Sequence, residues 1–221
     1  GGDLKWVSNT THWYSARVVL DGANSFSGQF TAERVYGNVA ERCYQSFVEA
    51  RHDLAMQNMD VSVIGKGNQS NMALAVNTDN LQMRSLSGNG FALLYAGAAL
   101  EGADHDKDEP LKIAPESTRR ATLTITGSEN NTFQGRVVGG ASGTNHGLSI
   151  VMSGSGTQTF NGSTVVFNNV SALAGKLVLN SAGLAINEDV TVARGAQLEI
   201  HGGWNLNEGH TLHVAGDASA A

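Results

Sequence analysis

Short segments in which apolar and polar residues alternate recur along the chain, for example at 61–63, 74–76 and 184–186. Successive side chains of a β-strand point to opposite faces, so this alternation predicts strands that have one face in the core. Segments rich in glycine, such as 88–90 and 201–203, separate the strands and are typical of tight turns. The pattern predicts an all-β protein.

The alternation is most regular near the C-terminal end. Leu184, Leu198 and Leu212 each begin a short apolar-x-apolar segment, and they are spaced 14 residues apart. This spacing predicts coils of two strands, with the three leucines stacked in one buried column. The residues that follow the leucines would form a column facing outward: Ala185, Glu199 and His213. In this register Glu199 and His213 are neighbours on adjacent coils.

A longer motif occurs three times, at 20–28, 125–135 and 152–162. Each copy has an apolar residue, a glycine, several small polar residues and then hydroxyl-aromatic-x-glycine. Internal repeats indicate stacked units that bury their apolar sides against one another. The repeats therefore favour a parallel β-helix, or solenoid, and a two-sheet β-sandwich is the alternative.

The chain divides into three predicted regions. Residues 1–100 form an N-terminal β repeat region, in which apolar residues at near-helical spacing predict a short helix near 38–59. Residues 101–120 carry many charges and both prolines, so we expect a charged loop or boundary there. Residues 121–221 form a C-terminal β-solenoid repeat region.

Composition excludes several classes of partner. The formal net charge is −6, and basic residues form no cluster beyond Arg119-Arg120, which argues against nucleic acid. No apolar run is long enough to insert into a membrane. Cys43 is the single cysteine, so the chain can form no internal disulfide and no thiolate metal site. We predict no cofactor and no metal. Gly1-Gly2 in place of Met is typical of a processed or trimmed start, so we expect a fragment of a longer chain.

The repeat units at 125–135 and 148–160 resemble the autotransporter-associated β-strand repeats of large bacterial surface proteins. The run at 50–58 and the glycine-rich segment at 86–90 are similar to the linking segments of those proteins. The resemblance implies a right-handed parallel β-helix passenger that a Gram-negative bacterium secretes or displays on its outer membrane. The charged insert at 101–120 departs from the family pattern.

One pair of carboxylates invites a catalytic interpretation. The segment 18–23, which contains Asp21, resembles the aspartic-peptidase loop without its threonine, and Asp53 is the candidate second member. Such enzymes need two carboxylates that share one proton, so that one activates water while the other protonates the substrate. The competing interpretation is that Asp21 and Asp53 are two solvated turn residues.

Two other segments suggest ligands. The alternating acidic residues at 104–109 resemble a calcium loop, but they lack its glycine and closing glutamate, so a solvated acidic loop is favoured. Trp6, Trp13 and Tyr14 precede the first repeat. Aromatic faces of this kind either bind sugars or cover the open end of a stacked core.

These observations predict a secreted or surface-displayed β-solenoid passenger that engages extracellular glycoprotein such as mucin. The alternative is an aspartic-type endopeptidase that degrades mucin-type glycoproteins, with Asp21 and Asp53 as its catalytic pair. A glycan-acting enzyme is the third hypothesis. Fold analogy does not decide among them.

Overall fold

The computed structural model describes residues 2–8, 16–35, 44–66, 70–98, 117–140, 146–204 and 209–215. Its secondary structure is entirely β: twenty strands in two sheets, with no helix among the described residues. The larger sheet has thirteen strands: β1 (Leu4–Ser8), β3 (Gly28–Arg34), β5 (Met56–Ile64), β7 (Asn80–Gly88), β9 (Arg120–Ile125), β10 (Asn130–Phe133), β12 (Gly147–Met152), β13 (Thr157–Phe160), β15 (Val170–Ala172), β16 (Lys176–Asn180), β18 (Val190–Val192), β19 (Gln197–His201) and β20 (Leu212–Val214). The smaller sheet has seven: β2 (Arg17–Leu20), β4 (Tyr44–Ala50), β6 (Ser70–Val76), β8 (Ala92–Ala96), β11 (Arg136–Val138), β14 (Thr164–Phe167) and β17 (Gly183–Ile186).

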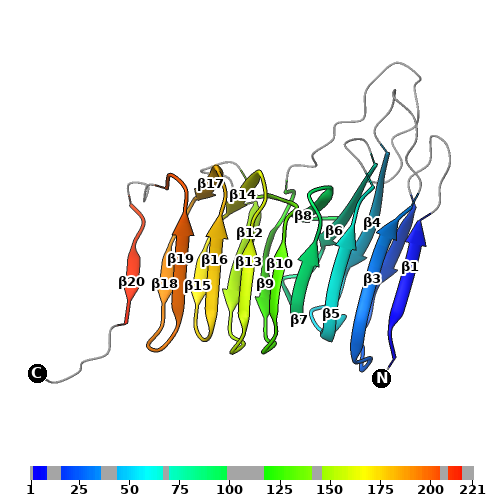
Figure 1. The fold of residues 1–221 in the computed structure, drawn as a ribbon, viewed down its shortest axis with the longest axis horizontal. Coiled ribbons are helices and arrows are strands. Elements are labelled where there is room, and N and C mark those ends of the chain that lie inside the picture. Colours follow the sequence, from blue (N-terminus) through cyan, green and yellow to red (C-terminus); the bar gives the residue numbers. More distant parts are fainter. Residues whose placement is uncertain are drawn as a thin grey trace, which may run out of the picture.

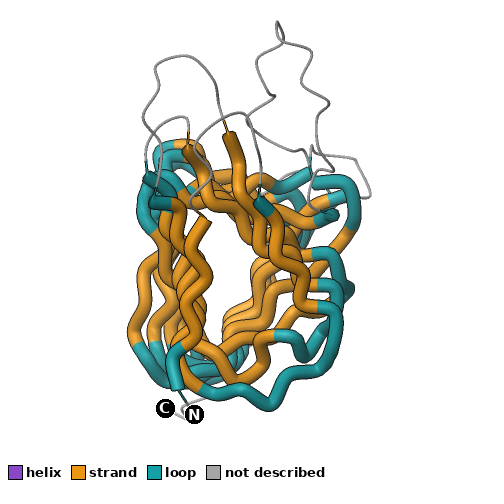
Figure 2. Tube along the Cα trace, turned by 90° about the vertical axis from the view of Figure 1, so that its right-hand side faces the viewer, coloured by secondary structure: helices purple, strands orange, loops and turns teal. Residues whose placement is uncertain are grey.

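The chain alternates between the two sheets, and every described strand pair is parallel. We use the word level for one turn of the chain around the stack. A level consists of one or two consecutive strands of the larger sheet and the smaller-sheet strand that follows them. Successive levels lie side by side along the long axis of the molecule (Figure 1). The view along that axis shows the strands of successive levels lying over one another (Figure 2).

The larger sheet forks at β7. Residues Asn80–Met83 of this strand pair with β9, whereas Gly88 pairs with Phe133 of β10. The backbone of Leu86 lies between these two pairings. The buried side chain of Gln158 fills this gap, since its Oε1 accepts from Leu86 N at 3.1 Å and its Nε2 donates to Leu86 O at 2.8 Å. Buried backbone groups need such partners, so Gln158 stabilises the fork.

One column of side chains runs through eight levels without a break. Following the strand pairs from β1 to β19, its members are Trp6, Ala32, Val63, Gly88, Phe133, Phe160, Leu179 and Ile200. We call this column the spine. Its phenylalanine rings meet edge to face, with centroids 6.0 Å apart for Phe133 and Phe160. All eight lie in or pack against the main hydrophobic core, apart from Gly88, whose missing side chain leaves room for Phe133.

The second and third repeats stack directly on each other. Ile125 pairs with Met152, and Phe133 pairs with Phe160. The repeat glycines allow this close approach, because a Cβ on Gly154 would lie 2.0 Å from the backbone O of Gly127. The first copy is not equivalent. It connects β2 of the smaller sheet to β3 of the larger one, whereas the other copies connect two strands of the larger sheet.

The predicted 14-residue column of leucines is wrong. Leu184 lies in the smaller sheet opposite Val165, Leu198 lies opposite Leu177, and Leu212 belongs to a third row. The levels β9–β11, β12–β14 and β15–β17 each contain three strands and not two. Stacked residues in the C-terminal levels are therefore about 20 positions apart, from 19 for Val165 and Leu184 to 22 for Val190 and Leu212. The predicted inward and outward alternation is confirmed in β16 and β17.

The outward column predicted with those leucines is wrong for the same reason. Glu199 lies opposite Val178, and His213 lies opposite Thr191, so the two are not neighbours on adjacent levels. Glu199 instead contacts Lys176, with 2.6 Å between Oε1 and Nζ. This contact and a further one to His201 lower the Glu199 pKa.

The helix predicted near 38–59 is not formed by the described part of that segment. Residues 44–50 and 56–64 are the strands β4 and β5, and residues 36–43 lie outside the described residues. In β4 both faces are buried: Val48 faces the main core, while Phe47 belongs to a second cluster on the other face of the sheet. Apolar residues on both faces of one strand imitate helical spacing.

The predicted boundary at 101–120 falls mainly outside the described residues. Both sheets nevertheless continue from one side of it to the other, through the pairs β7–β9 and β8–β11.

Candidate functional site: a polar corner

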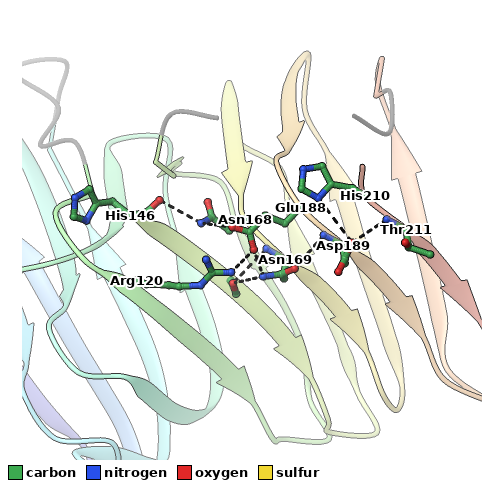
Figure 3. Close-up of polar contacts among 9 residues, drawn as sticks. Arg120, His146, Asn168, Asn169, Glu188, Asp189, His210 and Thr211 are labelled. Atoms are coloured by element: carbon green, nitrogen blue, oxygen red, sulfur yellow. Dashed lines mark hydrogen bonds and ion pairs between the residues drawn. The ribbon is translucent and has the colours of Figure 1, made fainter. Parts of the chain in front are cut away.

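Polar side chains gather in the turns that lead into the first larger-sheet strand of each level. Asn, Asp and Thr are typical turn residues, and the stacking of levels places these turns in a row. We call this row the polar corner. Its described members are Asp21, Asp53, Asn77, Thr78, Asp79, Arg119, Arg120, His146, Asn168, Asn169, Glu188, Asp189, His210 and Thr211. Figure 3 shows its C-terminal part.

Side-chain oxygens of the polar corner connect one level to the backbone of the next. Oδ1 of Asn169 accepts from Asp189 N at 3.0 Å, and Oδ1 of Asp189 accepts from Thr211 N at 2.8 Å. Asp53 does the same toward Asn80 N at 2.9 Å. These short side chains thus extend the hydrogen bonding between levels beyond the strands themselves.

Glu188 is the centre of the C-terminal part (Figure 3). Its carboxylate accepts hydrogen bonds from Arg120, from Asn169 Nδ2 at 2.5 Å and from Asn168 Nδ2 at 3.3 Å. The Glu188 side chain is 20% exposed, whereas that of Arg120 is half exposed. Since β12 and β15 lie between β9 and the turn that carries Glu188, the Arg120–Glu188 ion pair connects levels that are separated by two strands.

In the N-terminal part of the corner, a chain of side-chain contacts connects Arg119 to the buried carboxylate of Glu49. Arg119 contacts Asp79 and donates to Asn77 Oδ1 at 3.1 Å. Asn77 Nδ2 in turn donates to Oε1 of Glu49 at 2.7 Å. The Glu49 side chain has no exposed surface, and Arg51 Nε also contacts it at 2.7 Å.

Glu49 remains a carboxylate in this environment. Burial opposes ionisation, but the hydrogen bonds from Arg51 and Asn77, together with the positive charges of Arg51 and Arg17, outweigh it. The Glu49 pKa is therefore lowered. The nearby Tyr95 shows the opposite effect, since burial and the negative charge of Glu49 raise the Tyr95 pKa.

The two predicted catalytic aspartates lie at the same corner on consecutive levels. Asp21 follows β2 and Asp53 follows β4, and the backbone between them is joined by Arg51 N donating to Leu20 O at 2.9 Å. Asp21 is exposed, and its side chain has no hydrogen bond or ion pair with a described residue.

The Asp53 carboxylate is directed toward the following level instead. It accepts from Thr78 Oγ1 at 2.5 Å and from Asn80 N, and these two hydrogen bonds lower the Asp53 pKa. The geometry therefore gives Asp53 a connecting role in the polar corner. A catalytic pair of Asp21 and Asp53 stays a prediction.

Other predicted sites are described only in part. Trp6 is partly buried and packs against the main core at the first level. Trp13, Tyr14 and the acidic loop 104–109 lie outside the described residues. Within the described ranges, no three His, Cys, Asp or Glu side chains are grouped closely enough to hold a metal ion.

The sequence analysis missed the two residues that organise the corner, Glu49 and Glu188. The sequence does contain a pattern that could have located Glu188, namely the spacing of the turn residues. Asn169 and Asp189 lie in turns and are 20 residues apart. The strands that follow these turns begin at Val170 and Val190, which are also 20 residues apart. A 20-residue period would have placed these turns on one another. Glu49 had no such signal, because it occupies an outward position in an alternating strand.

Comparisons of the chain with protein-family models, with curated proteins and with solved structures found no match. In the part of the chain that the structure describes, no helix is long and apolar enough to cross a membrane.

Proposed function

We propose that the chain is a β-helix scaffold from a secreted or surface-displayed bacterial protein, and that its polar corner binds extracellular glycoprotein through the glycans. The β-helix interpretation is supported by the parallel pairing of every described strand and by the return of the chain to both sheets in each level. A sandwich is less well supported, because neighbouring strands in each sheet come from successive levels.

The observation that carries the proposed binding function is the continuity of the polar corner. Levels in a sheet repeat about every 4.8 Å, so the corner offers amide, carboxylate, guanidinium and hydroxyl groups at a regular spacing. An extended ligand with many hydroxyl groups can use such a row, whereas a compact molecule cannot. Several members are accessible, with side-chain exposures of 87% for Asp79, 52% for Asp189 and 50% for Arg120.

The charges of the corner suggest the kind of glycan. Both signs are present, as in the Arg119–Asp79 and Arg120–Glu188 pairs, and the whole chain carries a formal charge of −6. The net negative charge of the chain would repel a strongly anionic polymer. Neutral or weakly charged O-linked glycans of a mucin-type protein fit this charge better.

Binding of the chain to immobilised mucin, before and after chemical removal of the O-linked glycans, tests the proposal. We expect binding that falls when the glycans are removed, and that weakens in Asp79→Ala and Arg120→Ala. Glu129→Ala is the matched control, because Glu129 is exposed at a different turn, between β9 and β10. Binding that survives both deglycosylation and the corner variants would contradict the proposal.

The peptidase alternative has one observation in its favour, the position of Asp21 and Asp53 at one corner on consecutive levels. Incubation with mucin and with an unfolded protein substrate at acidic pH tests it. Cleavage that is lost in Asp21→Asn and in Asp53→Asn, with unchanged circular dichroism, would support the peptidase and displace the binding proposal.

A further inference from the structure

Two asparagines of the chain are followed directly by glycine, Asn89 and Asn161. An Asn-Gly pair is prone to deamidation, because glycine has no side chain to keep its backbone nitrogen away from the asparagine side chain. Both pairs lie in turns that lead from the larger sheet into the smaller one, between β7 and β8 and between β13 and β14. The two turns therefore share a dipeptide and a place in the fold, and they differ in what the side-chain amide contacts.

The side-chain amide of Asn89 is held against the preceding level. Its Oδ1 accepts from Gly65 N at 3.0 Å and from Phe91 N at 3.2 Å. Its Nδ2 donates to Gly65 O at 2.7 Å. Rotation of the amide toward the nitrogen of Gly90 would break these three hydrogen bonds, so the fold opposes any reaction between the two groups.

The side-chain amide of Asn161 is exposed and has no hydrogen bond with a described residue. The nitrogen of Gly162 likewise has no acceptor among the described residues. Asn180 occupies the same position in the next level and is also exposed, but the nitrogen that follows it, Ser181 N, donates to His201 O at 3.1 Å. Of the three asparagines, Asn161 alone combines an unbonded amide with an unbonded neighbouring nitrogen.

We propose that Asn161 is a site of spontaneous deamidation in the folded chain, and that the contacts of Asn89 protect the second Asn-Gly pair. Gly162 N loses its proton to water and forms a bond to Cγ of Asn161. The bond between Cγ and Nδ2 breaks, and Nδ2 takes up a proton from water and leaves as ammonia. One water molecule then opens the resulting cyclic imide at either carbonyl, which gives aspartate or isoaspartate. The net reaction consumes one water and releases one ammonia.

Isoaspartate would alter this turn more than aspartate. In isoaspartate the main chain runs through Cβ and is one carbon longer, whereas aspartate keeps the original backbone. The turn is packed closely on the preceding level, because Asn161 N donates to Phe133 O at 2.8 Å and a Cβ on Gly162 would lie 2.0 Å from Gly135 O. An additional backbone atom does not fit this stacking, so we expect isoaspartate to loosen the junction of β13 and β14.

Incubation of the full folded chain at mildly alkaline pH, followed by mass spectrometry of its peptides, tests the inference. Exchange of the amide for a carboxyl group changes the peptide mass, and fragmentation locates the residue. We expect Asn161 to deamidate at least tenfold faster than Asn89, since three hydrogen bonds of ordinary net strength oppose the reaction there. Asn180 is the internal control and should keep its amide over the same period. A rate at Asn161 no higher than the rates at Asn89 and Asn180 would overturn the inference.

The same measurement in concentrated urea separates the fold from the local sequence. Unfolding removes the contacts of Asn89 with Gly65, so the rates at the two Asn-Gly pairs should become similar. A difference that persists in urea would show that the fold does not protect Asn89, and it would also overturn the inference.

Two variants at Asn161 test the expected effect on the turn. Asn161→Asp carries the charge of the product on a backbone of normal length, and Asn161→Gln keeps an amide that reacts far more slowly because it must form a larger ring. We expect the amides of β14 to exchange hydrogen faster in the incubated wild type than in either variant after the same incubation. Unchanged exchange in incubated wild type that contains isoaspartate would contradict the loosening of the turn.

Discussion

The levels before the fork and those after it are built differently around the same spine. From β3 to β5 the chain uses 31 residues per level, measured from Phe30 to Val61, and the larger-sheet strands reach nine residues. From β15 to β18 a level takes 20 residues, and its strands are only three to five residues long. The spine nevertheless continues through both parts in register.

The additional length of the N-terminal levels accompanies a second layer of packing. Phe47, Ala73, Ala75, Leu93 and Tyr95 form a cluster on the face of the smaller sheet that is opposite the main core. The buried Glu49 belongs to the same face. In the C-terminal levels the corresponding outward residues, such as Val166 and Ala185, are partly exposed. The comparison shows that the spine sets the register, whereas strand length depends on what else the level buries.

The largest effect is expected in the N-terminal part, at Glu49. Glu49→Ala removes the buried carboxylate that Arg51 and Asn77 contact, and it leaves these partly exposed donors without their acceptor. Removing one partner of a buried ion pair costs about 3–5 kcal/mol, and we expect the lower end, about 3 kcal/mol, because the arginines left behind are one-third exposed. Urea unfolding followed by circular dichroism measures the change.

The C-terminal control for this experiment is Glu199→Ala, because Glu199 also pairs with a basic residue but is exposed. The urea midpoint of this variant should stay close to that of the wild type. Equal losses in the two variants would remove the distinction between the regions.

The next effect is expected at the fork, where the two kinds of level meet. Gln158→Leu leaves Leu86 N–H and C=O without their side-chain partner, and each unsatisfied group costs about 1–3 kcal/mol. The Leu86 amide should also lose protection in hydrogen exchange. The control is Gln134→Leu, at the exposed position next to Phe133. A protected Leu86 amide in Gln158→Leu would show that Gln158 does not stabilise the fork.

A smaller effect is expected where the spine lacks a side chain. A Cβ at Gly88 would lie 2.7 Å from the Phe133 ring and 2.9 Å from Val63 O, so Gly88→Ala should lower the free energy of unfolding by about 1–3 kcal/mol. Gly90→Ala serves as the control, since no atom lies within 4 Å of the position its Cβ would occupy. Thermal melting compares the two variants. A neutral Gly88→Ala would mean that the spine adjusts at the fork.

The smallest effect is the response of the two regions to acid. The Glu49 and Asp53 pKa values are lowered in the folded state, so their stabilising contribution is complete above the unfolded pKa values, near 4, and is lost as the pH falls through the folded ones. Hydrogen exchange should therefore show β4 and β6 losing protection at a higher pH than β13 and β16. Glu49→Gln should reduce this difference, and simultaneous loss of protection in all four strands would contradict the prediction.

Alternation predicted the strands well because a strand with one buried face has a period of two wherever it lies. It did not predict how many strands form a level. The apolar residues of β16, β17 and β18 look alike in sequence, although β17 lies in a different sheet. The 14-residue spacing of the three leucines therefore predicts a column that the structure does not contain, whereas residues that do stack are 19 to 22 positions apart.

The polar corner was predictable only as a set of turns. Asn169 and Asp189 have the residue types of turns, but their bonds to the next level depend on the spacing of levels. Glu49 was not predictable at all, because its burial depends on residues outside its own strand. The catalytic role that the sequence suggests for Asp53 stays a prediction, and the structure gives its carboxylate the partners Thr78 and Asn80 in the next level.

The parallel stacking also determines how the molecule would carry a load. Hydrogen bonds between levels run along the long axis, and the covalent chain runs across it, so tension between the two ends acts on non-covalent contacts alone. Under such tension we expect the stack to peel from its ends, beginning near Leu212 and Val214, where burial is least. Each released 20-residue level would exchange about 5 Å of stacked length for about 70 Å of extended chain. The protein would then yield in discrete steps and absorb work over a distance many times its own length.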